Sequence, residues 1–443
     1  MTGSRRTERW TARARVAARG LAARMRQIVT TEPGAGPDAG AEARARAGAD
    51  EARRLRGGVA KQAQLVGYLD AFGLEADTRA SLARLWDAIE PVGADAIAAV
   101  VEAELGAAPA ALFARWEESP LAAASLGQVH GAADADGAEY AVKVQYPGVA
   151  DALRDDVAAA GLVRALAGTA LGAHLPDDAV AALRAALLRE VDYDAEADAM
   201  ERTAAAFAGD ERAMIPAVDR RRSSGRVLTM ERVRGLTLLE AAEAVEPVRA
   251  AAAAAILHFA WAGPLAHGLV HGDPNPGNYL VLPGPPVRVA FLDHGCSARL
   301  DPATRDAERA TWRALLDRDP FAAAERFRQG LHGLGMIPSA RAFGEPTYQA
   351  WEHLVTAPIR AAGAFHFSPA YAADLVAATR RAVGTELVRT PGPVVLLWRQ
   401  RLGVAAVLGL LDVAIDARAI IGCALGAAPA PRSTDVPSLG HTH

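Results

Sequence analysis

Apolar residues recur at three- and four-residue spacing over much of this chain, which predicts a mainly helical protein. The pattern is clearest in 51–116, where Leu55, Val59 and Val66 lie on one helical face. A second helical block is predicted for about 177–207. The last large helical stretch covers 301 to about 425, with joints marked by Pro and Gly.

Short β-branched segments bounded by turn residues predict a smaller strand content. The sequence Asp134–Gly137 supplies an Asp-Gly turn, which favours a hairpin between the first two strands. After Gly235 the chain is predicted to be helical except for one later hairpin. The predicted strands are Gly127–Gly131, Tyr140–Gln145, Arg226–Glu231, Tyr279–Leu282 and Val287–Leu292. The pattern therefore predicts an α+β fold, with a small sheet-plus-helix part followed by a mainly helical part.

Length and composition limit the possible classes. A chain of 443 residues exceeds the size at which one hydrophobic core stops growing, so two packed bodies are expected. Hydrophobic residues make up 51% and charged residues 23%, as in ordinary globular proteins. A net charge of −4 argues against a nucleic-acid partner. Cys296 and Cys423 are too few for a disulfide framework, so a reducing compartment is expected.

Two features bear on membranes. Eight arginines in the first 30 residues interrupt every apolar run, which predicts a cytoplasmic protein without a secretory signal. This arm is a solvated tail or a basic amphipathic helix on an anionic membrane surface. The apolar runs Ala250–Gly272 and Leu402–Ile415 are interpreted as core helices, because the first contains His258 and Pro264 and the second is short. The arm and the second run together predict peripheral membrane contact.

Lysine and asparagine are rare. Of 48 Lys and Arg residues only Lys61 and Lys143 are lysines, and Asn275 and Asn278 are the only asparagines. Lys is a compact point charge, which can approach a phosphate in a way that the planar Arg fork cannot. These residues are therefore candidates for specific chemistry.

The strongest motif is His271-Gly-Asp-Pro-Asn-Pro-Gly-Asn278, followed fifteen residues later by Asp293. In kinase-like enzymes a loop Asp orients the nucleophile, while an Asn five residues on and an Asp after the next hairpin hold Mg²⁺. Asp273, Asn278 and Asp293 fit these three positions. The plain alternative is a Gly/Pro turn with a capping Asp.

Further upstream, Ala122-Ala-Ala-Ser-Leu-Gly-Gln-Val129 occupies the frame of a glycine-rich phosphate loop, with Ala at the first two Gly positions. Lys143 follows fourteen residues after Val129 and would pair with the α- and β-phosphates. The candidates for the carboxylate partner of Lys143 lie in the acidic stretch from Glu190 to Glu196. On one continuous helix Glu190 and Glu196 would diverge, so either the helix breaks near Tyr193 or only one acid faces Lys143. A solvated acidic face is the remaining interpretation.

These residues resemble the UbiB/ADCK family, also called the ABC1 or AarF atypical kinases. The distinctive marks are the alanine loop that ends in Gly127-Gln-Val, the Glu190-Val-Asp-Tyr segment with Glu196-Ala, and the hinge-like strand at 226–235. Lys61-Gln-Ala-Gln64 resembles the family's Lys-x-Gly-Gln motif, with Ala63 in place of Gly. A second departure is Ala199, where relatives often have Asn.

The resemblance implies binding of ATP or ADP with Mg²⁺, and ATPase or small-molecule phosphoryl transfer that supports isoprenoid-quinone or related lipid metabolism. It implies no conventional protein kinase activity, because the alanine loop and an occluding helical extension leave little room for a peptide. The catalytic candidates are Asp273, Lys143 and Lys61, and the metal candidates are Asn278 and Asp293. The nucleotide candidates are Ala122, Ala123, Ala124, Ser125, Gly127, Val129, Lys143, Glu196 and Met230. The extension and the Glu-x-Asp motif add Lys61, Gln64, Glu190 and Asp192.

The predicted organisation is a bilobal kinase-like fold with extensions. Its parts are a basic arm at 1–50, a helical extension at 51–116, an N-lobe at 117–235, a C-lobe at 236–425 and a polar tail at 426–443. Two other functions stay open: a catalytically silent chaperone module that binds nucleotide or lipid, and a phosphotransferase of the aminoglycoside or choline type. The oligomeric state is left open.

Overall fold

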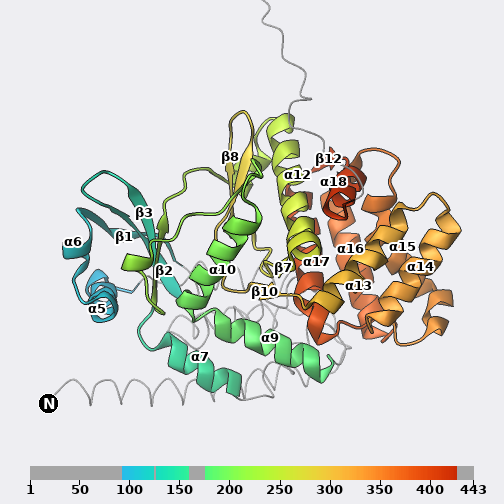
Figure 1. Cartoon of the computed structure of the whole chain (residues 1–443), viewed down its shortest axis with the longest axis horizontal. Helices are drawn as coiled ribbons and strands as arrows, with labels where there is room; N and C mark the ends of the chain where they lie inside the picture. Colours follow the sequence, from blue (N-terminus) through green and yellow to red (C-terminus); the bar gives the residue numbers. More distant parts are fainter. Residues whose placement is uncertain (1–91, 124–125, 159–174, 427–443) are drawn as a thin grey trace, which may run out of the picture. The chain divides into compact units, whose positions relative to one another are not determined.

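The computed structural model describes residues 92–123, 126–158 and 175–426 (Figure 1). The chain divides into two compact units between Ala170 and Leu171. The lobe boundary predicted near Gly235 stays a prediction. The predictions that fall on residues 1–91, 124–125 and 427–443 lie outside the described residues. They include those for Lys61, Gln64, Ala124 and Ser125.

The first unit contains an antiparallel meander preceded by short helices. Its elements are α5 (Ala94–Leu105), α6 (Pro109–Leu112), β1 (Arg115–Ala123), β2 (Gly127–Ala133), β3 (Glu139–Gln145) and α7 (Val149–Ala158). Arg115 and Trp116 already belong to β1, so the prediction that the helical stretch reaches residue 116 is wrong at its end. The apolar periodicity stops at Leu112, where α6 ends.

The predicted turn between β2 and β3 is confirmed. Gly137 has a φ of +86°, and its N–H donates to the Asp134 carbonyl over 3.2 Å. The Asp134 carboxylate also accepts from the backbone N–H of Ala138 over 2.9 Å. Asp and Gly thus supply the side-chain acceptor and the positive φ that this tight turn needs.

The second unit begins with two helices where the sequence pattern predicts one block. They are α9 (Asp177–Arg189) and α10 (Tyr193–Ala206). The break is stabilised by Asp192, the N-cap of α10, whose Oδ1 accepts from the Ala195 N–H over 3.0 Å. The helix therefore breaks directly before Tyr193, and Glu190 and Glu196 lie on opposite sides of that break.

Short strands follow through the second unit. Four of them form a mixed sheet in the order β4-β9-β8-β6, and two further pairs are β7 with β10 and β11 with β12. The later hairpin is confirmed, but the prediction that it is the only interruption is wrong, because strands of two or three residues carry too little pattern to be recognised. The bounds are β4 (Ala213–Met214), β5 (Val227–Glu231), β6 (Leu236–Thr237), β7 (Leu269–Val270), β8 (Tyr279–Leu282), β9 (Arg288–Phe291), β10 (Ala298–Arg299), β11 (Phe365–Phe367) and β12 (Val413–Ile415).

Helices make up the rest of this unit, where α13 packs against α14 and α16 packs against both α15 and α17 (Figure 1). The α-helices are α11 (Leu238–Ala242), α12 (Glu246–Ala262), α13 (Pro302–Arg313), α14 (Pro320–Gly333), α15 (Pro346–Arg360), α16 (Pro369–Gly384), α17 (Gly392–Leu411) and α18 (Ala417–Ala424). Single turns occur at η1 (Arg220–Arg222), η2 (Gly263–His267), η3 (Pro276–Asn278), η4 (Ala314–Leu316) and η5 (Ala340–Gly344).

The centre of the second unit is α17, which packs against α9, α12 and α16. Two helical segments of the described chain, Glu246–His267 and Gly392–Leu411, are long and apolar enough to cross a membrane. In their most apolar windows, 72% and 89% of the residues are buried inside the protein. Such burial is what core helices show, as the sequence interpretation expects.

Candidate functional site

The loop 271–278 follows β7 and is shaped by a glycine. Gly272 has a φ of +79°, and a Cβ added there would lie 2.8 Å from the Cys296 carbonyl oxygen. Only glycine fits both this backbone conformation and this close approach. The loop is thereby pressed against the segment that follows Asp293.

Asp273, at the centre of this loop, has both carboxylate oxygens in contact with side chains. Arg399 Nη2 donates to Oδ1 over 2.6 Å, and Asn278 Nδ2 donates to Oδ2 over 2.7 Å. The Arg399 side chain is only 4% exposed, and its guanidinium also donates to the Gly272 carbonyl. Charge-assisted bonds of this kind hold a carboxylate in one orientation.

Gln400 fixes the loop backbone beside Arg399. Its Oε1 accepts from the Gly272 N–H over 3.0 Å, and its Nε2 donates to the Ala260 carbonyl over 2.8 Å. Both residues come from α17, and sequence reasoning missed them. The available signal was the polar run Arg399 to Arg401 inside an otherwise apolar helix.

The hairpin β8–β9 brings Asn278 and Asp293 together. Tyr279 is paired with Phe291, and the Leu292 N–H donates to the Asn278 carbonyl over 3.0 Å. The two metal candidates therefore flank the open end of one hairpin. The Asp293 Oδ1 accepts from the Gly295 N–H over 3.0 Å, which orders the turn that follows.

Glu196 lies against that same turn. It is 1% exposed, and its Oε1 accepts from the His294 N–H over 3.4 Å. A Cβ at Gly295 would lie 3.3 Å from Asp293 Oδ1 and 3.6 Å from Glu196 Oε2. The acid on α10 is therefore adjacent to the carboxylate that follows β9.

Glu190 lies on the other side of the helix break and contacts Cys296, in the segment that follows Asp293. The Cys296 thiol donates to its Oε1 over 2.6 Å. Burial raises the pKa of Cys296 well above its usual value, and the Glu190 carboxylate adds to that effect. The thiol is therefore a neutral donor that positions Glu190. Asp192, the third acid of this stretch, caps α10.

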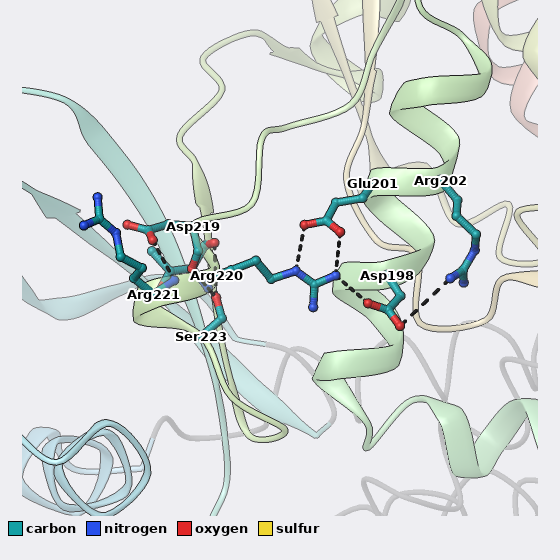
Figure 2. A network of polar contacts seen from close by, with 8 residues as sticks. Asp198, Glu201, Arg202, Asp219, Arg220, Arg221 and Ser223 are labelled. Carbon is teal, nitrogen blue, oxygen red and sulfur yellow. Dashed lines mark hydrogen bonds and ion pairs between the residues drawn. The ribbon is translucent and has the colours of Figure 1, made fainter.

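The outer face of α10 is fixed by a surface ion-pair cluster (Figure 2). Arg220 on η1 donates to both oxygens of Glu201 over 2.7 Å and to Asp198 over 2.5 Å. The bond from Arg220 lowers the pKa of Glu201. Arg202 lies 4.0 Å from Asp198 on the same helix. The bidentate contact restrains the helix that carries Glu196.

The remaining candidates in the first unit lie on its meander. Lys143 on β3 is paired with Val129 on β2, and Gly127 is paired with Gln145. Ala122 and Ala123 end β1, where Ala122 pairs with Val129. The described residues of the alanine motif are thus the end of β1, residue Leu126 and the start of β2.

Two further candidate positions have clear environments. Gln128, inside the alanine motif, is buried and bonds both backbone groups of Val92, over 3.1 and 3.3 Å. Met230 on β5 in the second unit is buried. Gln128 therefore ties the segment before α5 to β2, a structural role that the motif alone did not reveal.

Comparison with known proteins identifies the family of this chain. The model of the ABC1 atypical kinase-like domain matches residues 84–327, more than half of the chain. This match and the mixed α+β fold define a kinase-like protein. The chain belongs to the ABC1 atypical kinase-like family, which confirms the family and the fold predicted from the sequence.

Individual relatives are more distant. An uncharacterized protein of Mycobacterium tuberculosis, Rv0647c, is 35% identical over 255 residues, covering 54% of this chain and 50% of that protein. Atypical kinase COQ8, mitochondrial, of Saccharomyces cerevisiae is 28% identical over 247 residues, covering 55% and 48%. The chain thus spans about half the length of these relatives.

A solved structure shares the fold over most of the chain. The Mycobacterium tuberculosis protein Rv3197, determined in complex with erythromycin, superposes with a TM-score of 0.57 and 23% identity, covering 83% of this chain and 92% of that one. At this identity the likeness shows the fold alone.

Proposed function

We propose that this protein binds ATP or ADP with Mg²⁺ and catalyses nucleotide hydrolysis or phosphoryl transfer to a small molecule. The observation that supports the proposal is the backbone bond from Leu292 to Asn278 at the open end of the hairpin, together with the bond from the Asn278 amide to the Asp273 carboxylate. Kinase-like chemistry needs this set of groups, because its catalysis consists mainly of positioning and charge stabilisation.

The donor set fits Mg²⁺. The Asn278 side-chain nitrogen donates to Asp273, so its side-chain carbonyl oxygen is the atom that would coordinate the ion. Asp293 would supply a carboxylate oxygen. No group of three or more His, Cys, Asp or Glu suited to a metal occurs among the described residues. Mg²⁺ keeps several waters and takes substrate phosphates as ligands, so two protein ligands suffice. When bound, the ion would neutralise phosphate charge.

Asp273 would accept or orient the proton of the attacking hydroxyl or water. Arg399 and Asn278 hold its two oxygens, so the carboxylate is set before substrate arrives. Lys143 would pair with the phosphates, and Lys61 and Gln64 would belong to the covering extension. The other residues proposed to bind nucleotide are Ala122, Ala123, Ala124, Ser125, Gly127, Val129, Glu196 and Met230.

Isoprenoid-quinone or related lipid is the proposed metabolic context, and contact with an anionic membrane surface from the cytoplasm is the proposed location. Both rest on the family resemblance and on the arginine-rich arm. Flotation with anionic liposomes tests the location, and protein that stays at the bottom of the gradient would refute it.

Thermal-shift measurements with Mg-ATP, Mg-ADP and no nucleotide test the binding site. We expect stabilisation of the wild type that disappears on adding EDTA and is lost in Asp293→Asn. The matched control is Asp374→Asn, an exposed acid on α16. Equal nucleotide stabilisation in wild type and Asp293→Asn would refute the site. Stabilisation without any turnover, with lipid present, would favour a silent binding module instead.

A further inference from the structure

A cavity of about 320 Å³ lies in the second unit, apart from the proposed nucleotide residues. Its walls come from the last residue of α9, from α10 and the residue that follows it, from the end of α12, the η2 turn and the strand pair β7–β10 with its flanking residues. Ligand sites usually measure about 300 to 1,000 Å³. The cavity is therefore large enough for a small organic molecule. Neither Asp273 nor Asp293 lines it.

The charged side chains that line the cavity are all positive. Arg189, Arg202 and Arg299 line it, and no carboxylate does so among the described lining residues. Arg202 has an acidic neighbour, Asp198, at 4.0 Å, but Asp198 is also bound by Arg220 at 2.5 Å. Arg189 is partly buried, Arg202 and Arg299 are exposed, and three arginines at one cavity favour an anion that can take several hydrogen bonds.

Three polar atoms at this cavity are buried and have no hydrogen-bond partner in the described structure. They are Arg189 Nε, Ser297 Oγ and His271 Nε2. His271 is 6% exposed. A buried polar group without a partner is costly, so such groups are normally satisfied by a ligand or by water.

Part of the lining is apolar. Phe207 and Phe259 stack there, with ring centroids 4.7 Å apart, and Leu269 and Val270 lie next to them. An inorganic anion would leave this surface unused. An aromatic or short aliphatic body would cover it and gain from its removal from water.

We propose that this cavity binds a small phosphate monoester that carries an apolar body. The phosphate would meet Arg189, Arg202 and Arg299, and the body would pack on Phe207 and Phe259. A dianion matches three guanidinium groups better than a carboxylate does. This inference goes beyond the proposed function, since it adds a second site that holds neither metal nor nucleotide.

Isothermal titration calorimetry with phenyl phosphate tests the site on the full chain, without nucleotide and with EDTA, so that no metal-dependent site contributes. We expect saturable binding to wild type, about tenfold weaker in Arg299→Gln, because a bond to a charged group is lost. The control Arg313→Gln, on the exposed end of α13, should bind like wild type. Absent binding, or equal affinity in Arg299→Gln, would overturn the proposal.

Ala199→Leu gives a second test by filling the cavity, since Ala199 lines it from α10 and is 6% exposed. We expect loss of phenyl phosphate binding in a variant whose unfolding temperature is checked first. Inorganic phosphate and benzyl alcohol separate the two halves of the ligand, and each should bind at least about tenfold more weakly than phenyl phosphate. Inorganic phosphate that binds as tightly would show that the apolar wall is not used and would overturn the assignment.

Discussion

The guanidinium of Arg399 and the carboxylate of Asp273 form an ion pair across 126 positions of sequence, with Nη2 and Oδ1 separated by 2.6 Å. Both groups belong to the second unit, and the arginine side chain is almost completely buried. The partner that orients the central acid of the site therefore comes from the core helix α17. We infer that α17 couples the packing of the core to the geometry of the site.

Arg399→Gln should lower kcat for nucleotide turnover roughly 10- to 100-fold while changing nucleotide affinity much less, because Asp273 loses its fixed orientation. Steady-state kinetics and nucleotide titration together check this. Arg399→Lys keeps the charge but not the fork, and should recover only part of the rate. Arg318→Gln, an exposed substitution, is the control. A fall in affinity equal to the fall in kcat would contradict the positioning role.

Gly272→Ala should destabilise the protein by roughly 1–3 kcal/mol, because it combines an unfavourable positive φ with a Cβ 2.8 Å from a carbonyl oxygen. Gly333→Ala is the matched control, since a Cβ there meets no atom within 4 Å and the residue is the last of α14. It should be neutral or stabilising by up to about 1 kcal/mol. Denaturant unfolding measures both, and equal effects would contradict the account of the loop.

Asp192→Ala should lower the free energy of unfolding by about 0.5–2 kcal/mol, because α10 loses its N-cap. Asp192→Asn keeps a capping oxygen and should be close to wild type in stability. The pair also separates two roles of this acid. If Asp192→Asn is stable and yet loses nucleotide turnover, Asp192 takes part in the chemistry as well as in the cap.

Asp210 should make stability depend on pH. Burial alone would raise its pKa, but hydrogen bonds from His258 and Arg212 outweigh burial and hold the pKa well below its usual value. The His258 Nε2 lies 3.0 Å from Asp210 Oδ2. A depressed folded-state pKa gives stability that is present above the unfolded pKa and is lost as pH falls through the folded one.

The free energy of unfolding of wild type should therefore exceed that of Asp210→Asn by roughly 1–3 kcal/mol at pH 6 to 7. The gap should shrink below about pH 4, the usual pKa of Asp. Denaturant unfolding at several pH values checks this. A gap that is constant down to pH 3 would show that the pair contributes through packing alone.

Local sequence determined the parts of the site whose members are close along the chain. The spacing from Asp273 to Asn278 to Asp293, with a turn of Pro and Gly between two apolar strands, was enough to predict the hairpin and its acids. Hairpin register depends on neighbouring residues, so a short segment contains the information. The same holds for the turn at Gly137.

Tertiary structure decided the rest. In the sequence, Arg399 and Gln400 are two polar residues within an apolar helical segment. Only the packing of α17 brings them into contact with Gly272 and Asp273. The sequence also left open whether Glu190 and Glu196 could face the same site. Because the helix breaks at the Asp192 cap, Glu196 contacts His294 and Glu190 contacts Cys296 in one short segment. Periodicity reports which face of a helix is buried. It does not report which distant segment that face will meet, because this depends on how all the elements pack together.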